Sequence, residues 1–145
     1  MANYAVFNGD TDGIFAWHQL RLAHPREAIL VTGVKRDVGL VSRVDAGKGD
    51  LVTVMDVSHA KNRKDVQRLL DSGATVEYFD HHDPGELIEH PNITYHINTE
   101  PNVSTGLIVN SHVNGKNRLW SVATAFGDNH MDLAMNMACL LYTSD

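Results

Sequence analysis

Cysteine is almost absent from this sequence: Cys139 is the only one in 145 residues. One thiol cannot form an internal disulfide, and it cannot build a zinc site of several cysteines. The sequence also lacks a charged start followed by a long apolar stretch, and it has no run of about 18 uncharged apolar residues, the length of a membrane span. These absences predict a cytoplasmic protein with no membrane partner.

Positive charge is also scarce. Lysine and arginine number 12 against 18 aspartate and glutamate residues, the formal net charge is -6, and there are 9 histidines. Broad binding to a nucleic acid duplex needs a basic face, so the balance argues against such binding, although a local basic patch could still hold a small phosphate ligand. Hydrophobic residues make up 43% of the chain. At this length they predict one core, and hence one domain over residues 1–145.

Short runs rich in β-branched and aromatic residues alternate with segments of helical periodicity. The predicted strands are residues 4–7, 28–34, 51–57, 75–79 and 92–98, whose composition is typical of strands covered on both faces. The predicted helices are residues 13–22, a segment after the basic cluster 61–64, and residues 103–113, 119–126 and 131–141. Such alternation indicates βαβ units. The predicted fold is therefore α/β, a three-layer sandwich with a mainly parallel sheet flanked by helices.

Acidic and imidazole side chains follow the predicted strands at the points where the strands end. They are Asp10, Asp12, Asp56, Asp80, His81 and His82, with Asp128 after a later apolar run. In a parallel sheet these positions share one edge, where open α/β sheets bind ligands. Crowded carboxylates repel one another unless cations neutralise them, and carboxylates with an imidazole suit Mn²⁺ or Mg²⁺. The pattern predicts two bridged divalent ions that clamp a phosphate.

The same residues, in this order, resemble the motifs of a known enzyme superfamily. NGDTDG at 8–13, Asp56 within VMDVS, DHH at 80–82 and FGDN at 126–129 are similar to the four motifs of the DHH phosphoesterases, which include RecJ-type exonucleases and nanoRNA and pAp phosphatases. The resemblance covers nearly the whole chain. It implies the fold of that superfamily's N-terminal catalytic domain. It also implies metal-dependent hydrolysis of a phosphoester or phosphoanhydride through two Mn²⁺ ions, with Mg²⁺ as the alternative ion. The substrate would be a small phosphorylated molecule or nucleotide, with short single-stranded nucleic acid as the alternative, because the acidic charge disfavours a long polymer.

The resemblance also implies a role for each site residue. One ion would be held by Asp10 and Asp56. The other ion would be held by Asp12, Asp56, His81 and Asp128. His82 would be the catalytic group that faces the substrate phosphate or the leaving group, and Asp80 would orient an imidazole.

The sequence departs from the superfamily's pattern in two ways. Asn8 stands where many members have a histidine, and its amide oxygen would be a weaker metal ligand. The GGH signature of the second, substrate-binding domain does not occur. We therefore expect a single DHH-type catalytic domain that lacks the C-terminal domain. The apolar residues 131–141 would then pack on a second copy of the chain or on a segment outside this sequence.

Several residues near the same edge are candidates for contacts with the substrate phosphate. Lys35 and Arg36 follow the second predicted strand, and their charges suit a phosphate. Ser104 and Thr105 begin a predicted helix, whose first N–H groups can meet an anion. The basic cluster 61–64 is interpreted as the solvated start of a helix, with steering of a phosphate as the alternative.

Two other interpretations account for part of the pattern. NGDTDG and GDNHMD at 127–132 also resemble motifs of haloacid dehalogenase-like phosphatases, in which Asp10 would be a covalent nucleophile. That interpretation leaves Asp56 and the DHH triplet without a role. The second alternative is a metal-binding or nucleotide-binding module without catalysis, suggested by Asn8. Taken one at a time, the aspartates could also be turn residues or helix caps.

Overall fold

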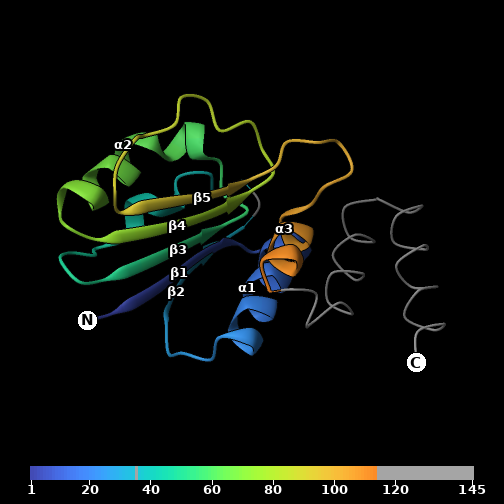
Figure 1. The fold of residues 1–145 in the computed structure, drawn as a ribbon, viewed down its shortest axis with the longest axis horizontal. Helices are drawn as coiled ribbons and strands as arrows, with labels where there is room; N and C mark the ends of the chain where they lie inside the picture. Colours follow the sequence, from blue (N-terminus) through green and yellow to red (C-terminus); the bar gives the residue numbers. More distant parts are fainter. Residues whose placement is uncertain (35, 114–145) are drawn as a thin grey trace.

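The computed structural model describes residues 1–34 and 36–113 (Figure 1). Its elements, in chain order, are β1 (Asn3–Asn8), α1 (Thr11–Ala23), β2 (Ile29–Gly33), the 3-10 helix η1 (Leu40–Arg43), β3 (Leu51–Met55), α2 (His59–Asp71), β4 (Thr75–Asp80), β5 (Ile93–Ile97) and α3 (Thr105–His112). All five predicted strands are confirmed. The helices predicted at residues 119–126 and 131–141 lie outside the described residues. None of the described helices has the length and hydrophobicity of a membrane span.

The five strands form one sheet in the order β2-β1-β3-β4-β5, and all four pairings between neighbours are parallel. The predicted parallel sheet is therefore confirmed. From β1 the chain adds β2 on one side and then β3, β4 and β5 on the other, so the strand order reverses at β1 and β3. In open α/β sheets, ligands bind outside the carboxyl ends of the strands at such a reversal.

Helices cover both faces of the sheet (Figure 1). Successive side chains on a strand point to opposite faces, and the core divides accordingly. Val54 and Tyr78 pack in a cluster with residues of η1 and α2. Their neighbours Met55 and Phe79 pack in a second cluster with residues of α1 and α3. The predicted three-layer sandwich is confirmed, with α2 and η1 in one outer layer and α1 and α3 in the other.

Each α-helix begins with a polar side chain that accepts a backbone N–H of the first turn. Asp10 accepts from Gly13 at 3.1 Å, Ser58 from Lys61 at 3.4 Å, and Ser104 from Leu107 at 3.2 Å. Such caps satisfy donors that have no partner inside the helix. Because Ser58 caps α2, Asp56 is not the cap of that helix.

Candidate metal centre

A cavity of about 380 Å³ opens at the carboxyl ends of β1, β3 and β4. Its lining includes six of the predicted site residues, namely Asn8, Asp10, Asp12, Asp56, His81 and His82. The cavity lies where the strand order reverses, the position predicted from the sequence. Asp128, the remaining predicted ligand, lies outside the described residues.

Asp56 directly follows β3 and has an unusual backbone conformation. Its φ is 61°, in the left-handed region that few residues other than glycine adopt. Its N–H donates to the carbonyl oxygen of Phe79 at 2.9 Å, and its side chain is 4% exposed. Burial raises the pKa of Asp56, the hydrogen bond from His81 opposes that rise, and the nearby Asp10 carboxylate adds to it. Strained, desolvated groups of this kind cluster at functional sites.

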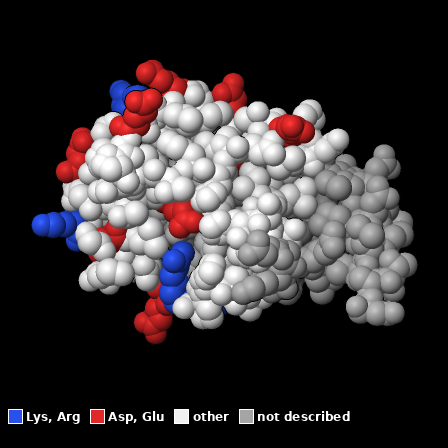
Figure 2. Space-filling view, in the orientation of Figure 1, with Lys and Arg blue, Asp and Glu red and all other residues white. Residues whose placement is uncertain are grey.

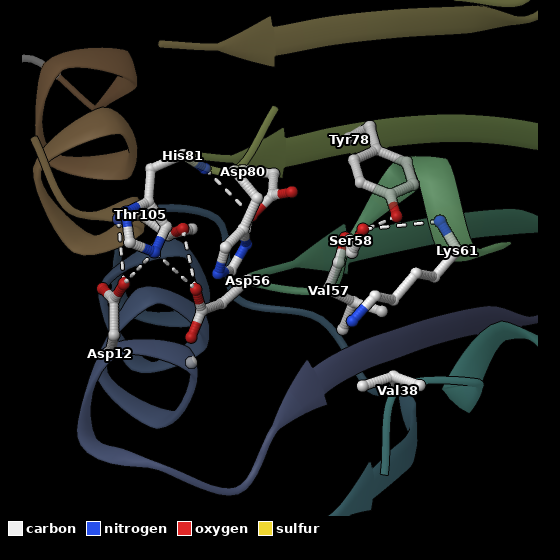
Figure 3. Close-up of polar contacts among 12 residues, drawn as sticks. Asp12, Val38, Asp56, Val57, Ser58, Lys61, Tyr78, Asp80, His81 and Thr105 are labelled. Atoms are coloured by element: carbon white, nitrogen blue, oxygen red, sulfur yellow. Dashed lines mark hydrogen bonds and ion pairs between the residues drawn. The ribbon is translucent and has the colours of Figure 1, made fainter. Parts of the chain in front are cut away.

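The His81 ring is held from both sides. Its Nδ1–H donates to the carbonyl oxygen of Val103 at 3.1 Å. Its Nε2 lies 3.1 Å from Oδ1 of Asp56 and 3.5 Å from Oδ2 of Asp12 (Figure 3). The hydrogen bond to Asp56 has the largest effect on the His81 ring, and together with the charges of these two carboxylates it raises the pKa of His81 to about 9. A carbonyl on Nδ1 fixes the tautomer in which Nε2 can bind a metal.

Asp12 is buried and joins the site to the start of α3. Its Oδ1 accepts the N–H of Gly106 at 2.7 Å, and its Oδ2 accepts the N–H of Thr105 at 3.0 Å. The anion at this helix N-terminus is therefore a carboxylate of the chain itself. Thr105 also donates its hydroxyl to Oδ1 of Asp56 at 3.2 Å. Ser104 and Thr105 are fully buried and neither is among the lining residues of the cavity, so their predicted contact with a substrate stays a prediction.

Asp80 and His82 form the second carboxylate–imidazole pair. The Nδ1–H of His82 donates to Oδ1 of Asp80 at 2.7 Å, and the backbone N–H of His81 donates to the same oxygen at 2.9 Å. The hydrogen bond to Asp80 raises the pKa of His82. Asp80 is fully buried, and its Oδ2 has no hydrogen-bond partner among the described residues. His82 is half exposed and lines the cavity, so its Nε2 is the edge of the ring available to a ligand.

Lys61 lines the cavity, although the sequence analysis favoured a solvated helix start for the cluster 61–64 to which it belongs. It lies in the first turn of α2, and among the described lining residues it is the only lysine or arginine. Figure 3 shows its side chain extending from α2 in the direction of Asp56. Its position in the helix that follows β3 was the available signal, because that helix begins at the same edge of the sheet. Arg36 is exposed and does not line the cavity, and Lys35 lies outside the described residues.

The donor atoms at this edge fit a divalent cation. Asp56, Asp80, His81 and His82 each offer a ligand atom, and these atoms lie within 4.8 Å of one another. Asp10 and Asp12 line the same cavity. Carboxylate oxygens with an imidazole nitrogen suit hard or borderline divalent ions. The described residues therefore could hold a metal where the sequence predicts one.

Comparison with known proteins identifies the fold. No protein-family model and no curated protein matches the sequence. One similar solved structure is exonuclease RecJ bound to manganese, with 16% identity and a TM-score of 0.53 over 85% of this chain and 32% of that chain. Another is RecJ from Thermus thermophilus in complex with Mn²⁺, with 15% identity and a TM-score of 0.54 over 87% of this chain and 21% of that chain. The chain thus has a fold similar to that of RecJ and spans a third or less of the length of these proteins.

Proposed function

We propose that this chain is the metal-binding catalytic domain of a manganese-dependent phosphoesterase. The observation that carries the proposal is the convergence of Asp10, Asp12, Asp56 and His81 on one cavity at the carboxyl edge of the sheet. The RecJ-like fold supports it, because both similar structures contain manganese. Location in the cytoplasm, the absence of a second domain and self-association stay predictions.

The proposed ligands are those that the DHH motifs imply. Asp10 and Asp56 would hold one ion. Asp12, Asp56, His81 and Asp128 would hold the other. When bound, Mn²⁺ supplies a water-derived nucleophile at neutral pH and offsets charge on the phosphoryl oxygens, and Mg²⁺ would do so from the same oxygen-rich ligands.

His82 and Lys61 would act directly on the substrate, and Asp80 and Thr105 would act through neighbouring residues. His82 has its Nδ1–H engaged with Asp80, so in the protonated ring the Nε2 proton is the one that can pass to a leaving oxygen. Asp80 stabilises that protonated ring, because its carboxylate raises the pKa of His82. The ammonium group of Lys61 would attract the substrate phosphate. Thr105, through its hydrogen bond to Asp56, would orient the Asp56 carboxylate toward the metal.

We propose a small nucleotide or a short oligonucleotide as the substrate. The cavity volume of about 380 Å³ suits a small molecule. Proteins that bind long single-stranded nucleic acids usually have a basic groove along which the strand lies. On the face drawn in Figure 2, the described lysine and arginine side chains are few and separated, and acidic side chains lie among them.

Calorimetry with Mn²⁺ tests the metal centre. We expect two ions per chain in the wild type and one fewer in His81→Ala. His18→Gln is a matched control, because His18 lies on α1 and is not among the lining residues of the cavity. No specific binding, or the same stoichiometry in His81→Ala, would contradict the proposed centre.

Hydrolysis of a chromogenic phosphodiester, followed by a series of short oligonucleotides, tests catalysis. Activity should disappear with EDTA and in Asp56→Ala, whereas His82→Ala should slow turnover while Mn²⁺ binding persists. Metal binding without turnover on any phosphoester would favour the non-catalytic module. A phosphoaspartate at Asp10 would favour the dehalogenase-like mechanism.

A further inference from the structure

A second group of metal-ligating side chains lies outside the cavity described above. Glu77 on β4, His96 on β5 and His112 at the end of α3 each offer one ligand atom, and the three atoms lie within 4.8 Å of one another. Glu77 precedes Asp80 by three residues on β4, which places it about 10 Å back along the strand. None of the three residues is among those that line the candidate metal centre.

The fold holds the two imidazoles against one aromatic ring. Phe79 pairs with His96 in the parallel register of β4 and β5, so the two side chains lie on the same face of the sheet. The ring of His96 stacks on Phe79 with a centroid distance of 4.5 Å and an interplanar angle of 11°. The ring of His112 meets Phe79 edge-on at 5.1 Å. Glu77, two residues before Phe79, belongs to the same face, so the three groups are positioned by packing.

The separations suit a bound ion better than direct hydrogen bonds. Oε1 of Glu77 lies 3.5 Å from Nε2 of His96 and 3.5 Å from Nε2 of His112. Good hydrogen bonds between nitrogen and oxygen are about 2.7–3.2 Å long. Neighbouring ligand atoms around a tetrahedral zinc ion, bound at about 2.0–2.1 Å, are roughly 3.3–3.4 Å apart. The observed distances match the second arrangement.

We infer that Glu77, His96 and His112 form a second divalent-cation site, which binds one Zn²⁺ ion. Two imidazoles and one carboxylate are a ligand set that zinc adopts in sites with an open fourth position. The centre at the carboxyl edge is richer in carboxylates, which suit Mn²⁺, so the two sites differ in ligand set. The three side chains are each about one quarter exposed (24%, 27% and 29%). His96 and His112 also line a cavity of about 400 Å³, through which a water can reach the fourth position.

Zinc titration of the full chain tests this site. After metal is removed with EDTA and the chelator is dialysed away, Zn²⁺ is titrated by calorimetry into protein whose manganese centre has been filled with Mn²⁺. Because Zn²⁺ can also displace Mn²⁺ from the first centre, the second site is read from the difference between proteins, and we expect one Zn²⁺ equivalent more in the wild type than in His112→Ala. Zn²⁺ should also raise the melting temperature of the wild type but not that of the variant. His18→Gln, which removes an imidazole outside both sites, should behave as the wild type.

Two conservative variants separate ligation from packing. His96→Phe keeps an aromatic ring that can stack on Phe79 but has no ligand atom, and Glu77→Gln keeps the shape of the side chain without its charge. Loss of the zinc equivalent in His96→Phe, with unchanged Mn²⁺ binding and an unchanged circular dichroism spectrum, is the expected result. Retention of that equivalent in His96→Phe or in His112→Ala would overturn the inference. Failure of the manganese centre in all variants alike would count against the proposed function and not against this site.

Discussion

Replacement of Asp12 by asparagine should destabilise the protein even when no metal is present. The buried carboxylate accepts the N–H groups of Thr105 and Gly106, one on each oxygen. Asparagine keeps one acceptor oxygen, and its NH₂ group faces the other N–H. A hydrogen bond to a charged group contributes roughly 1.5–3 kcal/mol, and a buried donor left unsatisfied costs about 1–3 kcal/mol. We therefore expect Asp12→Asn to lower the free energy of unfolding by about 2–4 kcal/mol, a large part of the roughly 5–15 kcal/mol typical of a domain.

Urea unfolding in EDTA, followed by far-ultraviolet circular dichroism, measures this loss. The matched control is Asp10→Asn, the same chemical change two residues earlier. Asp10 caps α1 through the N–H of Gly13, and asparagine caps helices as well as aspartate does. The control should change the free energy of unfolding by less than about 0.5 kcal/mol. Equal losses in the two variants, or no loss in Asp12→Asn, would refute the role of Asp12 in holding α3.

Three further predictions concern the frame around the site. In Gly13→Ala the new Cβ would lie 2.2 Å from a backbone oxygen of β1, so urea unfolding should show the free energy of unfolding reduced by roughly 1–3 kcal/mol. The control Gly47→Ala adds a Cβ in open space and should leave that free energy almost unchanged. The backbone N–H of Gly47 lowers the pKa of Asp50. The stability that Asp50 contributes is therefore present above its unfolded pKa and is lost as the pH falls through the lowered folded pKa. The melting temperatures of the wild type and Asp50→Asn should converge in acid, and a difference that stays constant with pH would contradict this. Tyr78→Phe deprives the buried carbonyl of Val57 of its hydroxyl partner at 2.5 Å and should lower the free energy of unfolding by about 1–3 kcal/mol. The loss should be smaller in Tyr4→Phe, because the hydroxyl of Tyr4 donates to a carbonyl in an exposed setting.

The strands were predictable because their composition is local information. Most observed boundaries differ from the prediction by one or two residues, and two of these differences have a clear physical reason. The third strand ends at Met55 and not at residue 57, because Asp56 turns into the left-handed region and cannot continue the sheet. Helix α1 begins at Thr11, two residues before the predicted start, because the cap is a side-chain contact of Asp10 that precedes the apolar periodicity. The order of the strands was not predictable, since it depends on which face each helix covers.

The convergence of the predicted site residues on one cavity was predictable because parallel strands bring their carboxyl ends to one edge. Contacts that depend on the docking of α3 were not. Asp12 and Gly106 are 94 residues apart in sequence, and no local pattern connects them. The same holds for Glu77, His96 and His112, which come from three elements and form a cluster only when β4 and β5 pair and α3 packs on them.

Asp12 and Asp56, two of the buried carboxylates of the centre, differ in what they do for the fold. Asp12 accepts two backbone N–H groups at the start of a helix, where a negative charge is favourable. Asp56 has a strained backbone and a raised pKa caused by burial, with the Asp10 carboxylate beside it. Two groups from other elements stabilise its carboxylate, namely the hydroxyl of Thr105, which donates a hydrogen bond to it, and the ring of His81. A residue selected for stability alone would avoid both the conformation and the buried charge. Under the proposed function, Asp56 is therefore the carboxylate that a bound cation would stabilise most, whereas Asp12 would bind metal and also hold the start of α3.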